Sequence, residues 1–244
     1  MAVATERAVS AHLELLGGWR LALDGARVEV PMTGQRVLAY LALMGRPVHR
    51  LHVAGVLWPD CDEESARASL RSALWRVPRR SDVVVGDSVH VALGPHVTVD
   101  VRELESDARQ VVAGGNDAHV TTGLVVGTSR EELLADWYDD WVLVERERLR
   151  HLRLHALEAI CDRLSRAGHY AEAVAAGLEA VAIEPLRESA HRVLVEAHLR
   201  EGNRWEALRQ VRACERVLSA ELGIGCSPML RSLVDRLEEP VTAA

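Results

Sequence analysis

The chain has 244 residues, of which 48% are hydrophobic, and its 29 basic against 36 acidic side chains give a net charge of −7. This length predicts two domains with buried cores, and the acidic balance argues against a protein that is basic along its whole length. Every basic residue is an arginine and the acidic surplus lies beyond residue 100, so any anion-binding surface is expected to be local.

The N-terminal residues predict a small antiparallel sheet. Alternating apolar residues indicate strands at 12–16, 19–23 and 27–30. Asp24-Gly25 supplies a hairpin turn between the second and third strands.

Three closely spaced helices are predicted next. Thr33 is expected to cap the first, which Gly45 and Pro47 end. The second covers 50–58 and stops at Pro59. The third helix, on which the functional prediction depends, follows directly.

The third helix begins near Glu63, where Asp60 or Asp62 can cap it, and ends at Pro78. Its residues divide into two arcs when placed at about 100° per residue. The apolar arc, expected to face a core, consists of Ala66, Leu70, Ala73, Leu74 and Val77. The opposite arc has no carboxylate and consists of Ser65, Arg67, Ala68, Ser69, Arg71, Ser72, Trp75, Arg76 and Arg79.

The polar arc is interpreted as a DNA-contacting surface. Short hydroxyls beside arginines let a helix approach phosphates and base edges closely, whereas an ordinary surface helix mixes charge signs. On this stretch alone, an ordinary surface helix in an arginine-rich chain stays an open alternative. Trp75 is expected to be covered by the hairpin or the sheet. The predicted DNA-binding residues are Ser65, Arg67, Ser69, Arg71, Ser72, Arg76 and Arg79.

A β-ribbon is predicted after this helix. Its strands are 83–85 and 89–93, with a turn at 86–88, and a further strand follows at 97–99. Sheet, three helices and hairpin predict a winged helix-turn-helix, whose third helix enters the major groove while the second braces it across the backbone.

Acidic residues count against part of this interpretation. Glu63 and Glu64 suit the helix dipole but repel phosphate, and the hairpin tip carries Asp87 and no arginine. We therefore expect the third helix to provide most of the affinity for DNA.

The second half of the chain predicts helices. A helix at 101–112 is followed by a flexible interruption at 113–117, and 118–129 show no clear pattern. Almost uninterrupted helical sequence then covers 130–166.

A repeat with an offset of 34 residues follows, because Gly-His-Tyr-Ala-Glu-Ala at 168–173 is echoed by Gly-Asn-Arg-Trp-Glu-Ala at 202–207. This is the tetratricopeptide period, and each unit predicts a helical hairpin. A closing helix is expected at 228–237. We predict a mainly α protein with a small β component: a winged-helix domain at 1–100 and an all-α, tetratricopeptide-like domain at 101–244.

Five segments in this order resemble one protein family. They are residues 57–60 (Leu-Trp-Pro-Asp), 66–76 (the third helix), 136–150 (beginning Asp-Trp-Tyr-Asp-Asp-Trp), 184–188 (Glu-Pro-Leu-Arg-Glu) and 220–223 (Ala-Glu-Leu-Gly). Together they are similar to the Streptomyces antibiotic regulatory protein (SARP) family, in which an OmpR-type winged helix precedes a bacterial transcriptional activator domain.

The resemblance implies a transcriptional activator that binds direct repeats in double-stranded promoter DNA and recruits RNA polymerase holoenzyme, often for antibiotic biosynthesis genes. The family's DNA-contacting helix maps onto 64–79. Larger members add a P-loop domain; this lysine-free chain has no such motif, which implies a nucleotide-independent type without a cofactor. For the C-terminal domain, a homodimer contact, a polymerase contact and small-molecule sensing stay open, with the first two favoured by analogy.

Other functions have less support in the sequence. His49 and His52 lack a third metal-binding partner at a fixed spacing, and Asp136, Asp139 and Asp140 are interpreted as a solvated helix start, so neither metal binding nor an enzyme is predicted. A protein-interaction scaffold without DNA binding is the stronger alternative, which the net charge of −7 favours.

The cysteines and the hydropathy pattern indicate the compartment. The four cysteines show no Cys-x-x-Cys spacing, which is typical of free thiols in a reducing cytoplasm. No apolar run approaches the ~18 residues of a membrane helix. We predict a cytoplasmic protein with no membrane partner.

Overall fold

The computed structural model describes residues 10–78, 82–114 and 131–235. Their contacts form two compact units: Met1–Leu104 with Arg130–Glu147, and Glu105–Ser129 with Arg148–Ala244. By these contacts the described residues 131–147 group with the first unit, whereas the sequence places the domain boundary at residue 100. The division falls inside two helices, α4 (Asp100–Val112) and α6 (Asp140–Arg166).

A four-stranded sheet lies in the first unit, where the sequence predicted three antiparallel strands; the added strand is the one predicted after the β-ribbon. The order of the sheet is β3-β2-β1-β7: the first three strands are antiparallel neighbours and β7 lies parallel to β1. Asp24 and Gly25 form the predicted hairpin turn, with positive φ values of 50° and 78°. The strands are β1 (Ala11–Glu14), β2 (Arg20–Leu23), β3 (Ala26–Arg27) and β7 (Val97–Val99).

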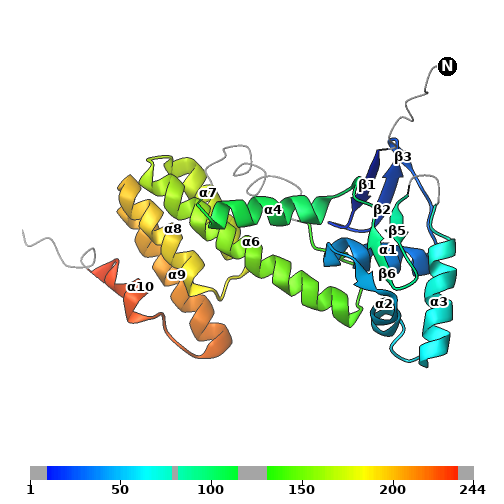
Figure 1. The fold of residues 1–244 in the computed structure, drawn as a ribbon. Helices are drawn as coiled ribbons and strands as arrows, with labels where there is room; N and C mark the ends of the chain where they lie inside the picture. Colours follow the sequence, from blue (N-terminus) through cyan, green and yellow to red (C-terminus); the bar gives the residue numbers. More distant parts are fainter. Residues whose placement is uncertain (1–9, 79–81, 115–130, 236–244) are drawn as a thin grey trace, which may run out of the picture. The chain divides into compact units, whose positions relative to one another are not determined.

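The three predicted helices are α1 (Met32–Met44), α2 (Arg50–Leu57) and α3 (Glu63–Trp75). Thr33 does not cap α1, so that prediction is wrong. The helix begins earlier because the carbonyl of Pro31 accepts the first backbone bonds, from Gly34 and Gln35 (2.8 and 3.0 Å). Figure 1 shows α1, α2 and α3 in the first unit, where α3 packs against the other two.

Both ends of α3 have a local cause. Asp62, one of the two predicted caps, accepts a hydrogen bond from the backbone N–H of Ser65 (2.9 Å). The helix ends at Trp75, three residues before Pro78. Proline has no N–H, so Pro78 cannot donate the helical hydrogen bond to the carbonyl of Leu74. The last turn tightens, with the N–H of Val77 donating to the carbonyl of Leu74 (3.3 Å).

The predicted β-ribbon is a three-stranded sheet of order β4-β6-β5. Its central strand pairs antiparallel with both neighbours. The sequence did not predict β4, a two-residue strand directly before α2. The strands are β4 (Val48–His49), β5 (Val84–Gly86) and β6 (His90–Leu93).

The segment before α6 is not helical, although the sequence predicts helix from residue 130. Leu133 forms a bridge with Leu16, and Leu134 has a φ of 45°. The guanidinium of Arg146 donates to the carbonyls of Leu133 (3.0 Å), Leu134 (2.7 Å) and Trp137 (3.1 Å). These contacts satisfy carbonyl groups that a helix would have paired internally.

The start of α6 contacts helix α1 of the first unit through two residues, Asp139 and Trp141. Asp139 accepts a hydrogen bond from Arg36 and is three-quarters buried, so the prediction that it is solvated is wrong. Trp141 packs edge-to-face on Tyr40, with ring centroids 5.4 Å apart.

The second unit is a helical-repeat structure, as predicted. Gly168 and Gly202 have φ values of 83° and 90° at equivalent helix ends, and Ala173 and Ala207 are fully buried between packed helices. The last helix is shorter than predicted, and 236–237 lie outside the described residues, as does most of the interruption predicted at 113–117. The helices of the repeats are α7 (Tyr170–Ile183), α8 (Glu188–Glu201), α9 (Arg204–Leu222) and α10 (Pro228–Ser232). In the part of the chain that the structure describes, no helix is both long and apolar enough to cross a membrane.

Candidate nucleic-acid interface

The two faces of α3 are separated as the periodicity predicts. Ala66, Leu70 and Ala73 are at most 3% exposed, and Val77 beyond the helix is also buried. Ser65, Arg67, Arg71, Ser72 and Arg76 are exposed, and Ser69 is half-buried. Burial of the apolar face fixes the helix, so its polar side chains are held on a rigid support.

The first turn of the polar face is occupied by acidic partners. Arg67 pairs with Glu63 (3.3 Å), and the hydroxyl of Ser65 donates to the carboxylate of Asp62 (3.0 Å). The hydrogen bonds that Ser65 donates to Asp62, first from its backbone N–H and then from its hydroxyl, lower the pKa of Asp62. The face is therefore not free of carboxylates at its N-terminal end, which corrects the sequence interpretation.

The unopposed charge lies further along the helix. Arg71 and Arg76 are exposed, and the side chain of neither forms an ion pair or hydrogen bond with any residue that the structure describes. Arg76 is the first residue beyond the helix, and Arg79 lies outside the described residues. The charge available to an external anion is thus that of Arg71 and Arg76.

Trp75 is 72% exposed, so the prediction that the hairpin or the sheet covers it is wrong. It follows Arg71 by one helical turn and therefore shares the exposed face. The strand β5 passes beside Trp75, and a groove of about 420 Å³ separates the two elements.

The groove brings together residues from three places in the sequence. Arg71 and Trp75 come from α3, Arg50 from the start of α2, and Asp82 from the residue that leads to β5. The sequence analysis did not single out Arg50, which carries no pattern of its own. The pairing of β4 with β6, and the hydrogen bond from the backbone N–H of Arg50 to the carbonyl of Val89 (2.8 Å), place it beside the hairpin of β5 and β6.

The hairpin of β5 and β6 is the wing, and Asp87 has a structural role in the turn at its tip. Its carboxylate accepts hydrogen bonds from the backbone N–H groups of Val89 and His90, both at 2.7 Å. These bonds, that of His90 first, lower the pKa of Asp87. The carbonyl of Asp87 accepts a bond from Nε of Arg50 (2.8 Å). The acidic residue at the tip therefore orders the turn and fixes an arginine beside the groove.

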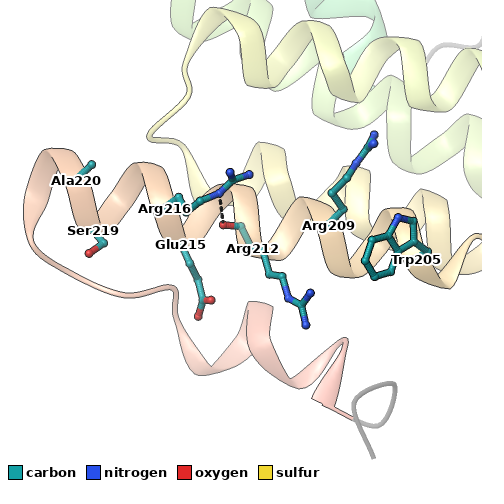
Figure 2. A pocket seen from close by; sticks show the side chains of 7 residues that line it. All are labelled: Trp205, Arg209, Arg212, Glu215, Arg216, Ser219 and Ala220. Atoms are coloured by element: carbon teal, nitrogen blue, oxygen red, sulfur yellow. Dashed lines mark hydrogen bonds between the residues drawn. The ribbon is translucent and has the colours of Figure 1, made fainter.

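A second surface lies on α9, in the other unit. Figure 2 shows Trp205, Arg209, Arg212 and Arg216 along this helix. These residues line a hollow of about 710 Å³. Trp205 is 65% exposed, and neighbouring Glu215 pairs with Arg231 (2.9 Å). An exposed aromatic residue among arginines is typical of a protein-contact surface.

The histidines considered as metal ligands have other partners. His52 lies 3.0 Å from the hydroxyl of Tyr40, and Nδ1 of His49 accepts the N–H of Leu51 (3.2 Å) at the start of α2. Within residues 10–78, 82–114 and 131–235, no group of three His, Cys, Asp or Glu side chains is arranged to hold a metal ion.

The comparisons with known proteins decide the family. The family model named bacterial transcriptional activator domain matches residues 99–238, more than half of the chain. The chain belongs to the bacterial transcriptional activator domain family. The sequence-based assignment to the SARP family, with a winged helix before this domain, is confirmed. No curated protein matches the sequence.

A solved structure shows the same fold as this member of the bacterial transcriptional activator domain family. It is EmbR of Mycobacterium tuberculosis, in complex with a low-affinity phosphopeptide, with a TM-score of 0.74 and 22% sequence identity. The match covers 94% of this chain and 65% of the EmbR chain. The likeness supports the arrangement of a winged helix followed by helical repeats.

Proposed function

We propose that this chain is a sequence-specific transcriptional activator that binds direct repeats in promoter DNA through α3 and recruits RNA polymerase holoenzyme. One observation carries the proposal: Arg71 and Arg76 are exposed and have no acidic partner among the described residues, on a helix whose other face is buried. Membership in the bacterial transcriptional activator domain family supports it.

The chemistry of α3 suits the major groove. Arginine binds phosphate oxygens or the O6 and N7 atoms of guanine, and small hydroxyls such as that of Ser72 bond phosphate or a base edge. A helix of 13 residues held by its apolar face has the dimensions that the major groove admits. The target genes proposed, by family resemblance, are those of secondary metabolism, including antibiotic biosynthesis.

Footprinting tests the proposed function. Fragments from upstream of the gene and its neighbours are incubated with the full chain and then cleaved. We expect protection of two or more direct repeats, with centres separated by whole helical turns of about 10 base pairs. No protection on any fragment, together with no mobility shift at low salt, would leave the alternative of an interaction scaffold without DNA binding.

The helical-repeat unit is proposed to supply the protein contacts, namely to RNA polymerase and to a second copy of the chain. The exposed Trp205 and the arginines of α9 support a protein contact on this face.

A further inference from the structure

The groove between α3 and β5 has the composition of a site for a nucleic-acid backbone. A large exposed aromatic side chain is left in water at an energetic cost, and when it lines a hollow it marks a contact surface. Trp75 is 72% exposed and lines this groove together with Arg71 and Arg50. The groove opens beside the same helix face that is proposed to enter the major groove.

Arg50 is held in place before any ligand arrives. Its Nε donates to the carbonyl of Asp87 at the wing tip (2.8 Å), which anchors the guanidinium group at the groove. The two terminal nitrogens of Arg50 form no hydrogen bond or ion pair with the residues that the structure describes. A guanidinium fixed in this way loses little side-chain entropy when it binds an anion.

We propose that this groove holds the sugar–phosphate backbone of one DNA strand, with Arg50 and Arg71 on phosphate and Trp75 against a deoxyribose. The inference rests on the proposed function and adds two contact residues, Arg50 and Trp75. Two guanidinium groups from different elements match the negative phosphates, and the indole ring offers an apolar face to the sugar.

One group in the groove opposes an anion. The acidic residue Asp82 also lines it. If a phosphate lies in the groove, removal of this charge strengthens binding. Asp82 has a φ of 43°, a conformation that asparagine also tolerates, so Asp82→Asn changes the charge without straining the backbone.

The test is a fluorescence-anisotropy titration of the full chain with two labelled duplexes, the footprinted repeat and an unrelated sequence, at several salt concentrations. The variants are Trp75→Ala, Arg50→Gln and Asp82→Asn. The matched controls are Tyr138→Ala, which removes another large exposed aromatic side chain, and Arg27→Gln, which removes an exposed arginine of β3.

We expect Trp75→Ala to weaken binding by about 3- to 10-fold on both duplexes alike, because a sugar contact carries no sequence information. Arg50→Gln should make the fall of log K with log salt shallower by about 1, as expected for one lost phosphate contact. Asp82→Asn should bind more tightly than the wild type, and both controls should match it.

The outcomes separate this inference from the proposed function. A wild-type chain that binds neither duplex overturns both. A wild type that binds while Trp75→Ala and Arg50→Gln behave like the controls overturns the groove alone. A loss confined to the footprinted repeat in Trp75→Ala also overturns it, since it indicates base reading. Because Trp75 is 72% exposed and belongs to α3, its variant keeps the test valid even if Arg50→Gln loosens the hairpin of β5 and β6.

Discussion

At the scale of single residues, His191 connects the stability of the helical repeats to pH. It is 2% exposed on α8, 2.9 Å from the carbonyl of Pro185 through Nε2 and 2.7 Å from the side-chain amide of Gln210 through Nδ1. These partners assign a neutral ring with the proton on Nε2. Burial lowers the pKa of His191, opposed by the bond to Pro185 and the charge of Glu188. A second proton, on Nδ1, would face the amide donor of Gln210.

We therefore predict that the repeats lose stability as the pH falls from about 6.5, the ordinary pKa of histidine. In this range the unfolded chain binds a proton that the folded chain does not, so the free energy of unfolding decreases until the lowered pKa of the folded state is passed. Urea denaturation, followed by circular dichroism at several pH values between 7.5 and 5.5, measures how the free energy of unfolding depends on pH.

The variant His191→Gln keeps a donor and an acceptor and should reduce this pH dependence. The variant His151→Gln, at an exposed position of α6, should leave it intact. Some dependence should persist in His191→Gln because burial also lowers the pKa of His198. If the free energy of unfolding of His191→Gln depended on pH as steeply as that of the wild type, the ring of His191 would not be the cause of the pH dependence.

At the scale of elements, predictions from the sequence succeeded where the cause is local. The two faces of α3 follow from its periodicity, and Asp62 and Gly45 act at helix ends by bonds to nearby residues. Periodicity places Trp75 on the polar arc of α3, but it could not predict that the hairpin leaves this side chain exposed, because that depends on where β5 passes. The spacing of Leu133 and Leu134 also suits a helix, but the bridge to Leu16 is a contact across more than a hundred residues.

The exposed face of α9 provides the element-scale prediction. The double variant Trp205→Ala/Arg216→Ala should keep the wild-type affinity for DNA but reduce transcription from the target promoter by roughly tenfold, because a central tryptophan carries much of a protein contact. Reconstituted transcription with purified polymerase measures the effect.

Leu178→Ala is the matched control, since Leu178 is an apolar residue of α7 that is 52% exposed. It should transcribe like the wild type. Full transcription by the double variant would remove this face of α9 from the contact with polymerase, while a loss of DNA affinity would assign it to the DNA interface.

At the scale of the whole molecule, the charge distribution determines how DNA is bound. A chain of net charge −7 is repelled by DNA at long range, so binding has to come from a few close contacts. The contacts proposed for Arg71 and Arg76 on the exposed face of α3 are of this kind. Affinity should consequently be low at high salt and rise steeply as salt is removed, since each phosphate contact releases counterions.

The salt dependence of DNA binding tests the central claim most directly. For the wild type, log K should fall by about 0.9 per phosphate contact for each tenfold increase in salt, and Arg71→Ala/Arg76→Ala should bind more weakly with a slope smaller by up to about 2. Arg27→Ala, which removes an exposed arginine from β3, should follow the wild type. A double variant with the affinity and slope of the wild type would contradict the claim that α3 holds the DNA.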